Sequence, residues 1–168
     1  MMSFTSLEGV GVDSKVQFLE TESVISPNEK WLGRVINAFG QPIDDKGFLP
    51  AGDHPIPLKN TPPPANKRNR VEGKMDLGIR AMNVFTTCCK GQRMGIFSGS
   101  GVGKSMLMSM IAKYSSADVN VIGLVGERGR EVQEFLQDYL GEEGLKNSIV
   151  VVATSDESAL LRKYAAYV

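Results

Sequence analysis

The chain has 168 residues, of which 42% are hydrophobic and 23% charged, a composition typical of a globular domain with a sizeable core. Nineteen basic residues balance nineteen acidic ones, and this zero net charge argues against a generally basic nucleic-acid-binding surface. The adjacent Cys88 and Cys89 with the single His54 exclude a disulfide framework and a zinc site, and neither a signal peptide nor a membrane-length apolar run is present.

Residues 1–58 have the texture of short strands joined by turns. Partial alternation at Val16 and Phe18 predicts a strand within Ser14–Glu20, and the apolar stretch Trp31–Ile36 predicts another. Turn residues at Ser26-Pro27-Asn28 and over 42–47 separate these segments. We therefore expect a small β element in this part of the chain.

Residues 59–74 are predicted to be a connector, because three consecutive prolines at 62–64 supply no backbone donors and fix φ. The stretch carries five basic residues: Lys59, Lys67, Arg68, Arg70 and Lys74. We interpret it as a solvated linker, with a contact to an acidic partner as the alternative. The apolar residues of Asp76–Phe85 then predict a short helix.

The pattern changes in residues 91–168, where apolar strands alternate with amphipathic helices. The predicted strands are Arg93–Phe97, Val119–Val125 and Ser148–Ala153, and the predicted helices are Lys104–Tyr114, Arg130–Leu140 (ended by Gly141) and Asp156–Val168. Near-continuous apolar strands are typical of sheets buried on both faces. The alternation predicts an α/β fold with a parallel sheet and right-handed crossovers.

A glycine-rich loop lies between the first of these strands and the first helix, at residues 98–105. It matches the phosphate-binding pattern G-x-x-x-x-G-K-[ST], except that Ser98 replaces the first glycine. Its glycines let backbone N–H groups converge on a phosphate at a helix N-terminus, Lys104 reaches the β- and γ-phosphates, and the Ser105 hydroxyl is suited to Mg²⁺. The candidate nucleotide-binding residues are Ser98, Gly99, Ser100, Gly101, Val102, Gly103, Lys104, Ser105 and Met106.

The alternative for this loop is a glycine-rich turn without a ligand, which the lysine and serine in register argue against. A second candidate is Glu127, which follows the strand ending at Val125 and so lies at the sheet edge where ligands bind. Its carboxylate could orient an attacking water beside a triphosphate. From position alone, an ordinary charged first helical turn explains Glu127 equally well.

Three stretches carry a resemblance to a known family: residues 32–44 (LGRVINAFGQPID), 91–105 (GQRMGIFSGSGVGKS) and 125–132 (VGERGREV). The chain resembles the catalytic ATPases of the rotary ATP synthase superfamily and, within it, the flagellar and type III protein-export ATPases. The GSGVGKS loop and GERGRE are more similar to the export ATPases than to the synthase subunits.

This resemblance implies a RecA-like P-loop core that hydrolyses ATP with Mg²⁺ in a homohexameric ring. It implies that Glu127 is the catalytic carboxylate, that Arg128 helps to hold the phosphate end of the site, and that Lys104 and Ser105 act in the P-loop. The implied partners are export-gate membrane proteins, a stalk or regulator protein and export substrates, with no nucleic acid. The implied location is cytoplasmic and peripheral at the inner membrane.

The resemblance also predicts the organisation of the chain. Residues 1–22 would be the end of an N-terminal β-barrel domain, 23–90 a strand, turn and proline-rich connector, and 91–168 the first half of the RecA-like domain. The family's Walker B aspartate, trans-acting arginine, adenine-contacting aromatic and C-terminal helical domain would follow Val168. We therefore expect a partial sequence that exposes apolar sheet area.

We also expect the 168-residue chain alone to have negligible steady-state ATPase activity, since loss of the trans arginine alone costs about 10³-fold or more. The alternatives are a catalytically inactive nucleotide-binding fragment and a fragment of an ATP synthase alpha/beta-type subunit.

Overall fold

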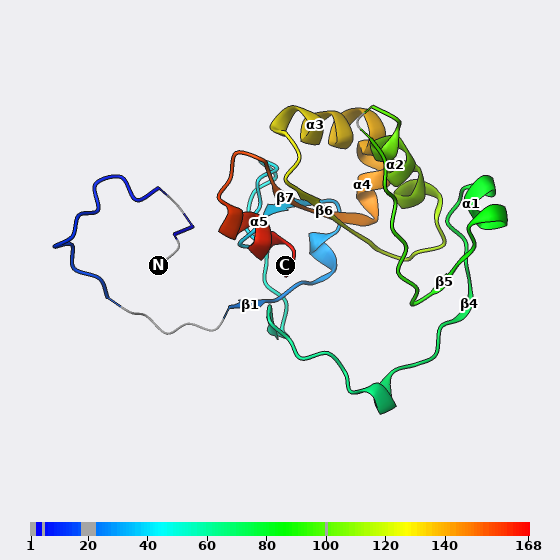
Figure 1. The fold of residues 1–168 in the computed structure, drawn as a ribbon, viewed down its shortest axis with the longest axis horizontal. Coiled ribbons are helices and arrows are strands. Elements are labelled where there is room, and N and C mark those ends of the chain that lie inside the picture. Colours follow the sequence, from blue (N-terminus) through cyan, green and yellow to red (C-terminus); the bar gives the residue numbers. More distant parts are fainter. Residues whose placement is uncertain (1–2, 5, 18–22, 100) are drawn as a thin grey trace.

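The computed structural model describes residues 3–4, 6–17, 23–99 and 101–168, and its centre is a three-stranded parallel sheet (Figure 1). The strand order is β2 (Val35–Asn37), β7 (Ser148–Ala153) and β6 (Asn120–Val125). The registers Val35↔Val150 and Ile122↔Val150 place β7 in the middle. The predicted parallel α/β architecture is confirmed, with an edge strand taken from the region before the connector.

Alternate residues of β7 face two separate cores, as the period of two in a strand requires. Val150 and Val152 pack with Val132, Phe135 and Leu140 from the helices on one face. Val151 and Ala153 pack on the other face with a cluster that includes Ala165 of helix α5 (Ala159–Ala165). Figure 1 shows the sheet between α5 on one face and the helices of residues 104–146 on the other, which gives a three-layer arrangement.

The helices agree with the predictions in position more closely than in type. Helix α2 spans the predicted Lys104–Tyr114. Helix α5 is shorter than predicted at both ends: it starts after Ser158, whose hydroxyl caps it by accepting from the Leu161 N–H at 3.2 Å, and it ends at Ala165. The predicted helix 130–140 is divided into α3 (Gly129–Glu134) and a π-helix, η3 (Phe135–Leu140). Gly141 ends η3 at φ 60°, but a short helix α4 (Gly141–Lys146) follows at once.

The predicted strand at Arg93–Phe97 is wrong. These residues have no strand partner within the described part of the chain, and the Phe97 side chain is 96% exposed. A strand forms only where a neighbour completes its ladder, so apolar composition alone does not produce one. Strand β6 also differs from the prediction, because alternate residues on it are exposed, including Val121 at 70%. The expected exposure of apolar sheet area is confirmed.

The first part of the chain contributes short elements around this sheet. Strand β1 (Val24–Ile25) pairs antiparallel with β3 (Ile56–Pro57), and the 3₁₀-helix η1 (Glu29–Trp31) occupies the start of the predicted strand Trp31–Ile36. No strand is found over 14–17, while residues 18–20 of that prediction lie outside the described residues. The N-terminal barrel remnant therefore stays a prediction.

The connector is exposed throughout, as expected for a solvated linker, and holds the short helix η2 (Ala65–Lys67) and, at its end, most of strand β4 (Glu72–Met75). Strand β4 pairs antiparallel with β5 (Cys88–Lys90), and helix α1 (Arg80–Phe85) lies between them in sequence within the predicted range. Across the described residues, no helix has the length and apolarity that a membrane span requires.

An ion pair that the sequence analysis did not identify holds β2 to the turn after it. Asp44 accepts two hydrogen bonds from Arg34, at 2.7 and 2.9 Å, and two more from the N–H groups of Val35 and Lys46. The second Arg34 nitrogen also donates to the Gly47 carbonyl at 2.7 Å. Both side chains are nearly buried, so this bidentate pair fixes the turn against the strand.

We predict that Asp44→Asn lowers the free energy of unfolding at pH 7 by about 3–5 kcal/mol, because it leaves a buried guanidinium without its counter-charge. Urea titration measures this change. Asp53→Asn, at an exposed aspartate of the same region, is the matched control and should change stability by less than about 0.5 kcal/mol. Equal effects of the two variants would contradict a stabilising role for the Arg34–Asp44 ion pair.

The same pair predicts a pH dependence. Burial alone would raise the pKa of Asp44, but the hydrogen bonds from Arg34, Val35 and Lys46 outweigh it and hold this pKa well below its usual range. A lowered folded-state pKa stabilises the fold fully above the unfolded pKa of about 3.9 and loses that contribution as the pH falls below it. Urea titrations from pH 7 to pH 2 should show a smaller loss of stability in Asp44→Asn.

Candidate functional site

The glycine-rich loop adopts the backbone conformation that its sequence requires. Gly101 and Gly103 have φ of 76° and 91°, in the left-handed region that other residues rarely adopt. Nothing lies within 4 Å of a Cβ built on either residue, so the space over the loop is open to a ligand. Ser100, one of the predicted binding residues, lies outside the described residues.

Helix α2 begins directly after this loop with its N-terminus uncapped by any side chain. Its N-cap is Gly103, and the N–H of Leu107 makes the first intrahelical bond, to the Gly103 carbonyl at 2.9 Å. The first N–H groups of a helix have no intrahelical partner and carry a partial positive charge. The loop therefore leads into a ready anion-binding helix terminus.

The two polar side chains of the first turn are free to meet a ligand. Lys104 and Ser105 are exposed, and neither makes an ion pair or a side-chain hydrogen bond among the described residues. A pocket of about 340 Å³ opens beside them and is lined by Ile96, Ser98, Val102, Gly103, Lys104, Met106, Leu107 and Met110. An unpaired cation, open glycines and a helix N-terminus together fit a phosphate group.

The second predicted element follows β6. Gly126 has φ 79°, and the next residue, Glu127, is half-buried with no side-chain hydrogen bond among the described residues. Arg128 is the N-cap of α3, and its exposed guanidinium makes a 3.4 Å ion pair with Glu131 in the first turn. Glu131 therefore lies in the first turn of α3, where a carboxylate is favoured by the helix dipole.

The structure brings the loop and the start of α2 together but does not join them to Glu127. No hydrogen bond or ion pair links Lys104 or Ser105 to Glu127 or Arg128 in the described part of the chain, and Glu127 does not line the pocket of Lys104. The reason lies in residues 93–99, which form no strand and so do not tie the loop to the sheet edge.

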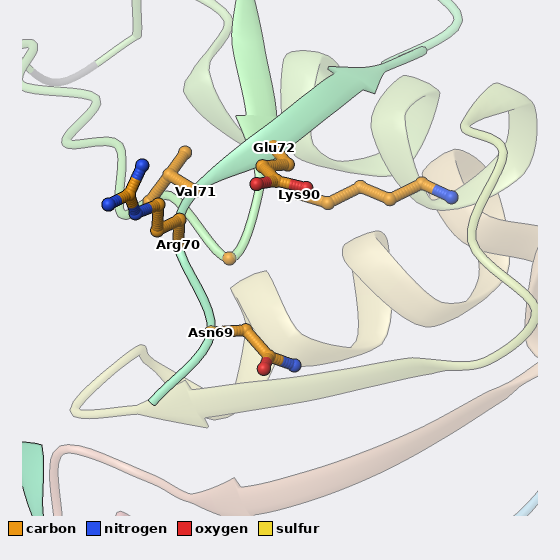
Figure 2. Close-up of a pocket in the computed structure, with 6 residues that line it drawn as sticks. Asn69, Arg70, Val71, Glu72 and Lys90 are labelled. Carbon is orange, nitrogen blue, oxygen red and sulfur yellow. The ribbon is translucent and has the colours of Figure 1, made fainter. Parts of the chain in front are cut away.

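Another pocket, of about 470 Å³, lies between the end of the connector and β5 (Figure 2). It is lined by Asn69, Arg70, Val71, Glu72, Lys90 and Gly91. In Figure 2 the Arg70 guanidinium and the Lys90 ammonium point in opposite directions, away from the Glu72 carboxylate. Because its polar groups diverge, this pocket does not form a converging ligand site.

Sequence reasoning missed the turn after β7, which contacts the backbone of Glu127 through the Ser155 N–H at 2.9 Å. The signal was present as Thr154-Ser155-Asp156, three turn-forming residues directly after a buried strand.

Among the described residues, no group of three His, Cys, Asp or Glu is arranged to hold a metal ion.

Comparison with known proteins identifies related chains. The model of the ATP synthase alpha/beta family, nucleotide-binding domain, matches residues 78–168. The flagellum-specific ATP synthase of Caulobacter vibrioides is 58% identical over 167 residues, covering 99% of this chain and 38% of that protein. The flagellum-specific ATP synthase of Bacillus subtilis is 58% identical over 136 residues, covering 81% of this chain and 31% of that protein.

Solved structures of type III secretion ATPases are also similar to this chain. The assembled ATPase EscN from the enteropathogenic E. coli type III secretion system superposes with a TM-score of 0.83 at 38% identity, over 98% of this chain and 40% of that one. A prototypical ATPase from the type III secretion system of pathogenic bacteria gives 0.78 at 42% identity, over 86% and 41%. The chain thus spans about two fifths of the length of these proteins.

We predict that Gly103→Ala destabilises the fold by about 1–2 kcal/mol, because a Cβ is strained at φ 91°. Thermal unfolding followed by circular dichroism measures the change. Gly99→Ala is the matched control in the same loop, since Gly99 has no left-handed φ and nothing within 4 Å of an added Cβ. A Gly103→Ala protein as stable as Gly99→Ala would show that the left-handed conformation is not required.

Proposed function

This chain belongs to the ATP synthase alpha/beta family, and we propose that it is the nucleotide-binding part of an ATPase that energises protein export by a flagellar or type III system. The observation that carries the proposal is the glycine-rich loop leading into the uncapped N-terminus of α2 with an unpaired Lys104. The flagellar and type III names of the relatives supply the biological setting.

Residues 98–106 would hold the phosphates of ATP. Backbone N–H groups from Gly101 to Met106 would cradle the β-phosphate, and Lys104 would place its charge between the β- and γ-phosphates. Binding here uses groups that are free among the described residues, so it breaks no contact of the fold. Because the phosphates carry most of the charge of ATP, the lysine should account for much of the affinity.

The Ser105 hydroxyl would be the protein ligand of a Mg²⁺ ion bound with ATP. Magnesium usually keeps several waters and takes substrate phosphate oxygens, so one exposed hydroxyl from the chain fits the ion without a carboxylate cage. When bound, Mg²⁺ neutralises charge that develops on the phosphate oxygens.

Hydrolysis needs a group that orients water at the γ-phosphate, and Glu127 would supply it. Its carboxylate is half-buried at the carboxyl end of β6 and free of side-chain hydrogen bonds in the described chain. It would accept a hydrogen bond from the attacking water. Arg128 would exchange its solvent-exposed contact with Glu131 for the charge of the phosphate end.

The relatives also guide the assembly that we propose. EscN is described as an assembled ATPase and in complex with its central stalk EscO, which supports a homohexameric ring and a stalk partner for this chain. Export-gate membrane proteins and export substrates would be further partners, at the cytoplasmic face of the inner membrane. Residues 1–22 would end a barrel domain, 23–90 would connect it, and 91–168 would begin the ATPase core.

We predict that Lys104→Ala weakens ATP binding by about 10- to 100-fold, the range expected for a lost charge-assisted hydrogen bond. Titration of the 168-residue chain with a fluorescent ATP analogue measures the dissociation constant. Lys67→Ala is the matched control, since Lys67 is an exposed lysine of the connector. Equal affinities of the two variants would refute the assigned nucleotide site.

We further predict that Lys104→Ala introduced into the chromosomal gene blocks export, while Lys67→Ala does not. Swimming in soft agar measures flagellar export, and the secreted protein profile measures virulence-type export. A Lys104→Ala strain that stops swimming but still secretes indicates flagellar export, and one that swims but stops secreting indicates virulence-type export. A Lys104→Ala strain that both swims and secretes normally would contradict the proposed function.

A further inference from the structure

The chain after β7 makes close backbone contacts with the segment that carries Glu127. The β6–β7 ladder ends at Val125↔Ala153, but two more hydrogen bonds continue it. The Gly126 N–H donates to the Ala153 carbonyl at 2.7 Å, and the Ser155 N–H donates to the Glu127 carbonyl at 2.9 Å. The Gly126 N–H and the Glu127 carbonyl are therefore both held by the end of β7 and the residues that follow it.

The segment that supplies the Ser155 N–H is a compact turn. The Glu157 N–H donates to the Thr154 carbonyl at 3.1 Å, which closes a four-residue turn with Ser155 at its second position. The Thr154 hydroxyl donates to the Asp156 carboxylate and lowers the pKa of that group. On its far side, the turn leads into Ser158, the cap of α5. The donor is thus presented by a preorganised loop.

We propose that Ser155 is a positioning residue for Glu127, which it holds through its backbone N–H. The inference rests on the catalytic role proposed for Glu127 and adds the element that aims this carboxylate. Because the Glu127 side chain has no hydrogen bond among the described residues, the hydrogen bonds that help to fix its direction are those of the backbone around it. Gly126, at φ 79°, would otherwise leave the segment free to swing.

Positioning of this kind matters for the transition state more than for binding ATP. The P-loop holds the phosphates, whereas a water-orienting carboxylate must lie within hydrogen-bond reach of one oxygen. A displacement of about 1 Å at such a group costs as much as 10²-fold in rate. Removal of the Ser155 donor should therefore leave ATP affinity intact and weaken binding of a transition-state mimic.

The test replaces Ser155 by proline. Proline is favoured at the second position of a turn, so Ser155→Pro keeps the loop but deletes the one N–H that contacts Glu127. Ser155→Ala is the conservative variant, because it retains the N–H. Ala159→Pro controls for a nearby proline, since Ala159 is the first residue of α5 and Ser158 before it has φ −59° and ψ 148°, compatible with a following proline.

Two affinities are measured on the 168-residue chain: for a non-hydrolysable ATP analogue, and for ADP with aluminium fluoride, which stands in for the γ-phosphoryl group during transfer. We expect Ser155→Pro to keep analogue affinity within about twofold and to weaken the aluminium fluoride complex by about tenfold, as one lost backbone hydrogen bond allows. Ser155→Ala and Ala159→Pro should bind both ligands like the unmodified chain.

Amide hydrogen exchange supplies a readout that is independent of ligands. In Ser155→Pro the Gly126 amide should lose about tenfold in protection, while the amides of Val150 and Val152 inside β7 stay protected and so report an intact sheet. An unchanged Gly126 amide, or tight binding of the aluminium fluoride complex by Ser155→Pro, overturns the proposal.

Glu127→Gln separates this inference from the function on which it rests. If Glu127→Gln weakens the aluminium fluoride complex and Ser155→Pro does not, Glu127 acts at the phosphate end and the positioning role is wrong. If Glu127→Gln has no effect on that complex, the catalytic role of Glu127 is wrong and the positioning role falls with it. Tenfold weakening by both variants, with rescue in Ser155→Ala, supports both.

Discussion

The central strand β7 is the element on which this fold depends. It pairs in parallel with β2 on one side and β6 on the other, and most of its residues are buried. A parallel strand in this position must be apolar on both faces, because helices cover each face. The valine-rich Ser148–Ala153 meets that demand and divides the interior into two cores. The loops after β6 and β7 then emerge side by side, which is where Glu127 and Ser155 meet.

Elements that depend on local pattern were predicted well. Helix α2 and strand β7 have the predicted bounds, and the glycine-rich loop has the left-handed residues that its motif implies. The predicted strand at Arg93–Phe97 failed because a strand needs a partner, and pairing is not encoded within the segment itself. For the same reason, the motif identifies the chemistry of Lys104 but not its distance from Glu127.

The interactions that sequence reasoning missed are polar contacts across the chain. Arg34 and Asp44 are ten residues apart, and nothing in their spacing indicates a buried bidentate pair. The contact from Ser155 to Glu127 joins two loops through backbone atoms, which carry no side-chain signal at all. Charge and turn propensity mark such residues as polar and exposed. The parallel pairing of β6 and β7 brings Ser155 to Glu127, whereas the turn after β2 folds Asp44 back beside Arg34.

The π-helix η3 changes which side chains a helix of this length can bury. Phe135 and Leu140 are five positions apart, and in an α-helix they would point about 140° away from each other. Hydrogen bonding from i to i+5 brings them onto one side, and both are buried in the same core beneath the sheet. The wider turn thus changes the angle between successive side chains, so that one short segment buries two large apolar side chains in the same core.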